Sequence, residues 1–112
     1  MEEEKMKRKH IFIAMFRALD CLYDEIPSKE LGFFLSEANP YLFKDRDSAD
    51  PAIRNEFNCF VNEFCKGQEE TVEVAYEAVK NYLQEKGFQE QFAEITMDEW
   101  KALCQIVETE ED

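Results

Sequence analysis

The feature that most constrains this fold is the spacing of the apolar residues, which recur every three or four positions along most of the chain. The pattern is clearest from Glu4 to Asp24 and from Gln68 to Lys86. This spacing gathers the apolar side chains on one face of an α-helix and leaves charged side chains on the other. Glycine and proline number only three each, fewer than β-rich or disordered chains of this length usually carry. The sequence therefore predicts an all-α fold.

Capping residues divide the pattern into separate helices. Ser28 is a suitable N-cap for a second helix over Lys29 to Ala38, because its hydroxyl can accept a hydrogen bond from an amide of the first turn. Asp50 followed by Pro51 predicts the start of a third helix, and Gly67 predicts its end. The stretch between these two helices is the longest irregular segment that we expect.

The C-terminal part of the chain has similar boundary signals. Gly87 is expected to end the fourth helix, and residues 88–95 fit one or two further helical turns. Thr96 and Glu99 form a capping box at the start of the last helix, in which each side chain accepts a hydrogen bond from the other residue's amide. The acidic tail, residues 108–112, is expected to fray into solvent. We therefore expect about five helices in one compact bundle or array, a single domain over residues 1–112.

Acidic residues are concentrated in the second half of the chain. Residues 1–55 hold 11 acidic and 9 basic side chains, whereas residues 56–112 hold 15 acidic and only 4 basic ones. The formal net charge of −13 repels phosphate backbones and anionic membrane surfaces, so we expect neither nucleic acid nor a membrane as a direct ligand. The same charge attracts a basic protein and accelerates its association at low salt. The predicted partner is therefore a basic protein.

Export and membrane insertion are not expected. Arg17 follows the apolar run Ile11–Phe16, so this run is shorter than the apolar core of a secretory signal. No run approaches the roughly 20 apolar residues of a membrane-spanning helix. We therefore expect a cytoplasmic protein with reduced cysteines. The cysteines fall within helical apolar patterns and are interpreted as small core residues: Cys21, Cys59, Cys65 and Cys104.

No arrangement of residues in the sequence indicates catalysis or a cofactor. The only histidine, His10, follows a lysine-rich start and is interpreted as a surface side chain, since a catalytic histidine needs an orienting partner. The segment from Asp45 to Asp50 resembles a calcium loop, but it lacks the glycine that an EF-hand needs. No cysteine and histidine spacing indicates zinc ligands. We therefore predict a protein that is not an enzyme and has neither a metal site nor a cofactor.

The predicted binding surface is an acidic stripe on the fourth helix. Its members recur at helical spacings on the outer side: Glu69, Glu70, Glu73 and Glu77. We expect further carboxylates to extend it: Glu63, Glu90, Glu94, Asp98 and Glu99. Like charges at these spacings slightly destabilise an isolated helix, which leaves two interpretations: a solvated face, or a docking surface for arginine and lysine side chains. Few lysines compensate these charges, which adds weight to the docking interpretation.

Three aromatic residues fall outside the helical stripes: Tyr41, Phe43 and Phe88. Large apolar groups are usually inside a protein, so we expect these rings in the core. The alternative is that one or two of them are exposed anchors at an interface.

The segment Phe33–Phe43 reads Phe-Phe-Leu-Ser-Glu-Ala-Asn-Pro-Tyr-Leu-Phe, and it continues into Asp47–Ala52, which reads Asp-Ser-Ala-Asp-Pro-Ala. These residues resemble stretches in small helical immunity proteins of bacterial contact-dependent inhibition and polymorphic toxin systems. The resemblance implies a cytoplasmic inhibitor that sits on its cognate toxin domain, often a nuclease, and blocks the active site or substrate groove. Nuclease domains tend to be basic because they hold phosphates, so an acidic chain complements such a partner.

The predicted function is therefore that of an immunity protein that neutralises a basic toxin domain. The alternative is an acidic adaptor or nucleic-acid mimic that regulates basic proteins through general charge. Selectivity for one partner at moderate salt separates the two, because charge attraction alone weakens with ionic strength. An enzyme would need a pocket that converges on His10 or on a cysteine. The identity of the partner and the oligomeric state stay open.

Reversing Glu70, Glu73 and Glu77 to lysine tests the docking interpretation. We expect weaker partner binding with unchanged helicity, because these side chains contribute surface charge and no core contact. A binding titration measures the first effect and circular dichroism the second. Unchanged affinity of the triple variant would rule out this surface.

Overall fold

The computed structural model describes residues 7–40, 51–68 and 71–111. Six helices lie in these ranges: α1 (Arg8–Glu25), α2 (Lys29–Ala38), α3 (Pro51–Phe64), α4 (Val72–Lys86), α5 (Gln89–Phe92) and α6 (Met97–Glu111). These ranges contain no strand, so the predicted all-α class is confirmed. Among the helices described, none combines the length and the apolar composition needed to cross a membrane.

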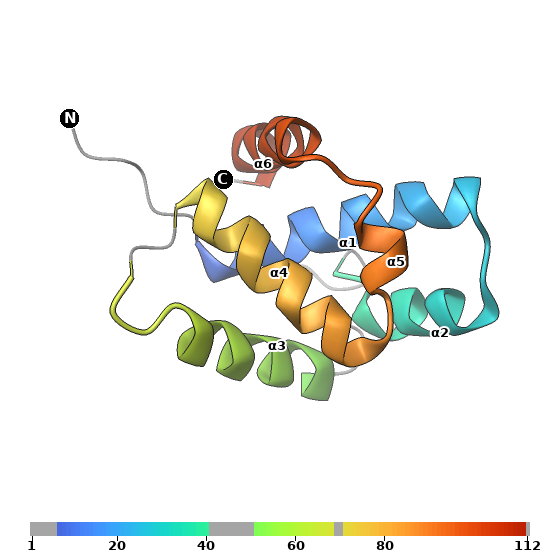
Figure 1. The fold of residues 1–112 in the computed structure, drawn as a ribbon, viewed down its shortest axis with the longest axis horizontal. Helices are drawn as coiled ribbons and strands as arrows, with labels where there is room; N and C mark the ends of the chain where they lie inside the picture. The colour runs from blue at the N-terminus through green and yellow to red at the C-terminus, as the bar shows by residue number, and fades with distance from the viewer. Residues whose placement is uncertain (1–6, 41–50, 69–70, 112) are drawn as a thin grey trace.

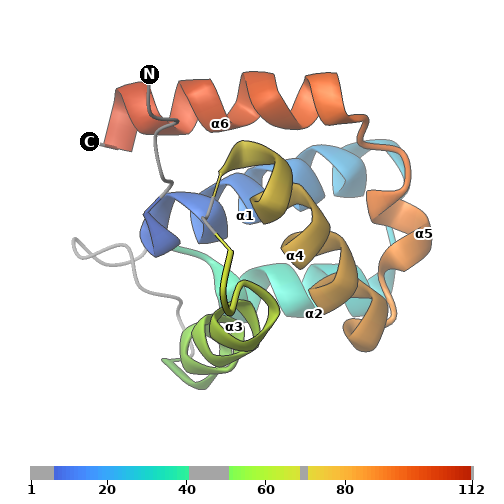
Figure 2. The same ribbon diagram turned by 60° about the vertical axis from the view of Figure 1, so that its left-hand side comes forward.

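The centre of the fold is α1, which contacts each of the other five helices. Figure 1 shows α4 crossing in front of α1, with α6 on one side of α4 and α3 on the other. In Figure 2, α6 runs along one side of α1, while α2 and α3 lie on the opposite side. The short α5 lies where the chain turns from α4 to α6. These helices enclose one core, which confirms the expected compact bundle.

The first half of α1 is buried on every side. Seven consecutive residues, His10–Phe16, are each at most 8% exposed. Consecutive residues of an α-helix point about 100° apart, so seven in a row cover the whole circumference. The sequence pattern predicted one broad apolar face instead. That arrangement holds only in the second half of α1, where Leu19 and Leu22 are buried while Asp20 and Cys21 are exposed.

The prediction that His10 lies on the surface is wrong, because this side chain is buried, at 5% exposure. The start of α1 lies against α3. There the Arg8 guanidinium donates hydrogen bonds to the backbone oxygen of Asn58 (3.3 Å) and to the side-chain oxygen of Asn62. We predicted an exposed His10 because lysines precede it in the sequence. Those lysines show that the segment is polar, but they do not show that α3 lies against it.

Aromatic rings join α1, α3 and α4. Phe57 of α3 lies edge-on against Phe12 of α1 and Tyr82 of α4, with ring centroids 5.2 and 5.1 Å apart. All three side chains are at most 1% exposed. The Tyr82 hydroxyl donates to Glu56 Oε1 at 2.9 Å, and Glu56 pairs with Lys86 at 2.5 Å. The buried rings and this polar edge together hold α3 against α4.

Cap geometry confirms several predicted helix boundaries. At the start of α2, Ser28 Oγ accepts a hydrogen bond from the Leu31 amide at 3.0 Å. Gly87 ends α4 at a φ of 87°, a left-handed conformation that a residue without a Cβ adopts readily. Pro51 is the first residue of α3, and Gly67 follows the end of that helix with a φ of 80°.

The fourth helix begins later than predicted, at Val72 and not at Gln68. Thr71 caps it, because its hydroxyl oxygen accepts a hydrogen bond from the Val74 amide at 3.3 Å. Gln68 belongs to the turn after α3, where its amide donates to the Cys65 carbonyl oxygen at 2.8 Å. The backbone of Gln68 is therefore used by the preceding turn and does not start α4.

The last helix runs to Glu111, although residues 108–112 were expected to fray. Val107 is fully buried, so the helix is anchored close to its end. Beyond it, the Glu110 carboxylate accepts a hydrogen bond from the Arg17 guanidinium of α1 at 2.6 Å. This ion pair joins the acidic end of α6 to α1. Asp112 lies outside the described residues.

The four cysteines occupy two different environments. Cys65 and Cys104 are buried, as predicted, whereas Cys21 and Cys59 are exposed and do not fill the core. Burial, with a further contribution from the Glu108 charge, raises the pKa of Cys104 to about 12. This thiol therefore stays protonated at neutral pH.

Replacing Phe57 by alanine tests the contact between α1, α3 and α4. We expect a loss of about 3–5 kcal/mol in the free energy of unfolding, because the change leaves a cavity between two other rings. Urea denaturation followed by circular dichroism measures the loss. Asn55→Ala, an exposed change on the same helix, should alter stability by less than about 0.5 kcal/mol. Equal effects of the two changes would contradict the central role of Phe57.

Candidate functional site

Three aromatic side chains fix α4 beside the start of α6. The Tyr76 ring lies 5.4 Å from Phe92 and 6.1 Å from Trp100, measured between ring centroids. The Tyr76 hydroxyl donates to the Ile95 carbonyl oxygen at 2.5 Å. The Trp100 indole N–H donates to the Val72 carbonyl oxygen at 3.0 Å. These contacts set the positions of the carboxylates on the surrounding surface.

The predicted capping box closes the first turn of α6. The Thr96 amide donates to Glu99 Oε1 at 2.9 Å, and the Glu99 amide donates to the Thr96 hydroxyl oxygen at 3.2 Å. Glu99 therefore supports the helix, although its side chain is exposed. A substitution at Glu99 changes the helix start and the surface charge together, so it does not test binding alone.

Charged side chains face one another across the boundary between α4 and α6. Lys101 of α6 pairs with Glu73 of α4 at 3.1 Å, and this hydrogen bond holds the pKa of the Glu73 carboxyl below its ordinary value. Burial, and then the negative charges of Glu77 and Glu99, raise the pKa of Tyr76 above its ordinary value. Glu77 lies one turn after Glu73 on α4, and Glu99 lies in the first turn of α6.

We use the term acidic surface for the exposed carboxylates along this boundary. Its members are Glu73, Glu77, Glu94, Asp98 and Glu99. Glu94 lies in the turn between α5 and α6, and Asp98 lies beside Glu99 in the first turn of α6. Lys80 and Lys101 are exposed cations on the same two helices. The carboxylates outnumber them, so the surface keeps an excess of negative charge.

Two other predicted members lie away from this surface, and two lie outside the described residues. Glu63 is exposed on α3, which lies on the opposite side of α4 from α6 (Figure 1). Glu90 is exposed on α5, outside the boundary between α4 and α6. Glu69 and Glu70 lie outside the described residues.

The exposed apolar residues differ from those considered in the sequence. Phe88 is buried, with its ring centroid 5.3 Å from that of Phe34, which confirms the core interpretation for this residue. Tyr41 and Phe43 lie outside the described residues. Within the described ranges, the large exposed apolar side chains are Phe33 (64%), Ile26 (53%) and Ile106 (45%). Helical spacing did not identify them, because it does not show which faces other helices cover.

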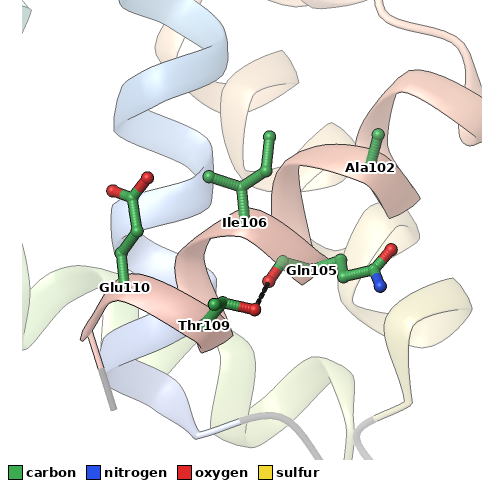
Figure 3. Close-up of a pocket in the computed structure, with 5 residues that line it drawn as sticks. All are labelled: Ala102, Gln105, Ile106, Thr109 and Glu110. Carbon is green, nitrogen blue, oxygen red and sulfur yellow. Dashed lines mark hydrogen bonds between the residues drawn. The ribbon is translucent and has the colours of Figure 1, made fainter.

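Ile106 lines a shallow groove of about 320 Å³ on the outer side of α6. The groove is formed by Ala102, Gln105, Ile106, Thr109 and Glu110. Figure 3 shows Ile106 between Ala102 and Glu110 in one row on α6, with Gln105 and Thr109 in a neighbouring row. The Thr109 hydroxyl donates to the Gln105 backbone oxygen at 2.9 Å. The sequence signal for this groove is a pair of apolar residues, Ala102 and Ile106, that lie off the buried stripe of α6.

A polar cluster occupies a second pocket, of about 270 Å³, between α3 and α4. Burial, and then the hydrogen bond to Glu56, raise the pKa of Tyr82. Burial also raises the pKa of Glu56, but its bonds with Lys86 and Tyr82 outweigh that effect and lower it. These groups bind one another and thereby link α3 to α4. In the parts of the chain that the structure describes, no group of three or more His, Cys, Asp or Glu side chains is placed to hold a metal ion.

Replacing Glu77 by glutamine should lower the pKa of Tyr76. A neighbouring negative charge disfavours the ionised phenol, so its removal moves the pKa of Tyr76 back toward the ordinary value. An NMR titration of the labelled Tyr76 ring measures the shift. Glu30→Gln, an exposed change on α2, should leave the pKa of Tyr76 unchanged. Identical titration curves for both variants would contradict this effect of the Glu77 charge on Tyr76.

When the chain was compared with protein-family models, curated proteins and solved structures, nothing matched. The placement and charge of the side chains on α4 and α6 are the observations that bear most directly on function.

Proposed function

We propose that the protein is a non-catalytic immunity protein, which binds a basic toxin domain and covers its active site or substrate groove. The acidic surface on α4 and α6 is the observation that supports this proposal most. The preferred partner is a nuclease domain, because such domains bind phosphates through lysine and arginine side chains. A cytoplasmic location belongs to the same proposal, since a nuclease toxin acts where the cell's nucleic acid lies.

Charge supports the proposal at two stages of binding. The net charge of −13 attracts a basic domain before contact, over about 8 Å at physiological salt. On contact, the carboxylates of the acidic surface can pair with the cationic side chains that otherwise hold phosphate. The inhibitor then takes the place of the nucleic-acid backbone.

The rigidity of the acidic surface also supports the proposal. Glu73 and Glu77 project from a helix whose Tyr76 is bonded to the turn before α6. Glu99 is held by the capping box. Side chains on an ordered scaffold lose less conformational entropy on binding than side chains on a flexible segment do. Tight inhibition of a toxic enzyme benefits from this preorganisation.

The alternative is an acidic adaptor or nucleic-acid mimic that binds several basic proteins through charge alone. The groove at Ile106 favours a selective partner, because apolar contacts depend on shape and do not weaken with ionic strength as charge attraction does. Binding that persists at moderate salt is therefore expected of the immunity protein and not of the mimic.

Co-expression tests the proposed function directly. The gene immediately upstream of the gene for this protein is the candidate toxin gene. The C-terminal domain of its product is produced in cells with and without this protein, and growth is measured. We expect the domain to be toxic alone, growth to be rescued by this protein, and a stable complex to co-purify. A harmless domain, or toxicity that persists while this protein is soluble, would contradict the proposal and favour the adaptor.

Reversing Glu73 and Glu77 to lysine should lower the association rate constant with the toxin domain by about tenfold or more, because it removes steering charge. Surface plasmon resonance at low salt measures this rate. The exposed pair between Glu73 and Lys101 contributes little to stability, so the variant is expected to fold.

The matched control reverses Asp20 and Asp24 to lysine. These exposed carboxylates have the same spacing on α1 as Glu73 and Glu77 have on α4. Both double variants change the net charge equally. A larger decrease in the association rate constant for the α4 variant would assign the steering to the acidic surface. Equal decreases for the two variants would show that only the net charge matters.

A further inference from the structure

α6 has a second apolar stripe that stays exposed among the residues that the structure describes. The inner stripe, Trp100, Cys104 and Val107, is buried on the side that faces α1 and α4. Ala102 and Ile106 lie on the outer side, where Ile106 is 45% exposed. A surface helix needs only one apolar stripe to pack on its own core. The outer stripe is therefore available to contact another molecule.

The described residues that line the groove along the outer stripe all belong to α6. These residues follow the spacing of a helix-docking seam: Ala102, Gln105, Ile106, Thr109 and Glu110. Ala102 is small and lies beside Ile106 in one row, and the small Thr109 lies in the neighbouring row (Figure 3). A second helix can therefore approach α6 closely and pack its side chains on both sides of Ile106.

Carboxylates lie at both ends of the groove. Asp98 and Glu99 come one turn before Ala102, and Glu110 lies at the other end. Asp98 and Glu110 are separated by about 18 Å along the axis, at about 1.5 Å per residue. Glu110 pairs with Arg17, but its side chain stays 53% exposed, and the last turn of α6 contains no basic residue. The groove is thus apolar in the middle and negative at its ends.

We propose that this groove is the docking site for an amphipathic helix of a basic protein. The apolar face of that helix covers Ile106, and its cationic residues reach Asp98 and Glu110 at the two ends. This inference rests on the proposed function, because it takes the partner to be basic. A second copy of this chain does not fit, since α6 carries five carboxylates and one lysine and would repel itself. Asp98 also belongs to the acidic surface, so one partner can contact both.

A synthetic peptide tests the site independently of the partner's identity. The peptide has about five helical turns, with leucine and alanine on one face and lysine pairs at both ends, about 18 Å apart. The isotope-labelled full chain is titrated with it and followed by NMR. We expect saturable binding with amide shifts concentrated on Ala102, Ile106 and Thr109. A peptide with glutamate pairs in place of the lysines should bind about tenfold more weakly or worse.

Ile106→Gln is the deciding variant. It should weaken binding of the lysine peptide by about tenfold or more, because it removes the apolar contact at the centre of the groove. Ile26→Gln is the matched control, since it makes the same chemical change at an exposed isoleucine that ends α1. Both isoleucines are largely exposed, so neither variant removes a core contact and both are expected to fold.

Three outcomes would overturn the groove assignment: unchanged affinity of Ile106→Gln, amide shifts elsewhere on the protein, or equal binding of the two peptides. The co-expression test separates this inference from the proposed function. If wild-type protein and Ile106→Gln rescue growth equally and bind the toxin domain with equal affinity, the immunity function stands and the groove assignment falls. If wild-type protein fails to rescue while the lysine peptide binds at Ile106, the groove assignment stands and the immunity function falls.

Discussion

The burial of α1 from His10 to Phe16 is the constraint on which the rest of the fold depends. A helix that is buried around its whole circumference needs neighbours on every side, and α2 to α6 supply them. Each of these helices covers only part of α1, which explains why so short a chain is divided into several short helices. Their inner faces pack against α1 and against one another, and their outer faces are exposed to solvent and carry the charged side chains.

This division lets the fold tolerate a concentration of negative charge. Carboxylates on α4 and α6 repel one another and oppose the approach of the two helices. Exposed charges in water interact by about 1 kcal/mol or less, whereas burial of a side chain as large as phenylalanine contributes about 1.5–3 kcal/mol. Tyr76, Phe92 and Trp100 provide several such contributions at the same boundary. The apolar contribution is the larger, so α4 and α6 stay together beneath like charges.

Signals that act within one helical turn could be read from the sequence, whereas the arrangement of the helices could not. The Ser28 cap and the capping box of α6 need only residues a few positions away, and both formed as predicted. The exposure of a side chain depends instead on which helix lies nearby. His10 is buried where the start of α1 meets α3, and Ile106 stays partly uncovered. Glu63 lies on α3 and is therefore away from α6. Periodicity shows which residues share a face, but not which faces meet. The acidic surface was therefore predicted, but with Glu63 and Glu90 included, and the groove was not predicted.

Trp100 provides the protein with an intrinsic optical probe. It is the single tryptophan of the chain, and it lies fully buried beneath the acidic surface with its indole N–H bonded to the Val72 carbonyl. Indole emission responds to the polarity and the electric field around the ring. Unfolding brings water to the ring and shifts its emission to longer wavelength, whereas a protein seated on α4 and α6 alters the field while the ring stays dry. An unlabelled fluorescence spectrum can therefore distinguish loss of the fold from occupation of the surface.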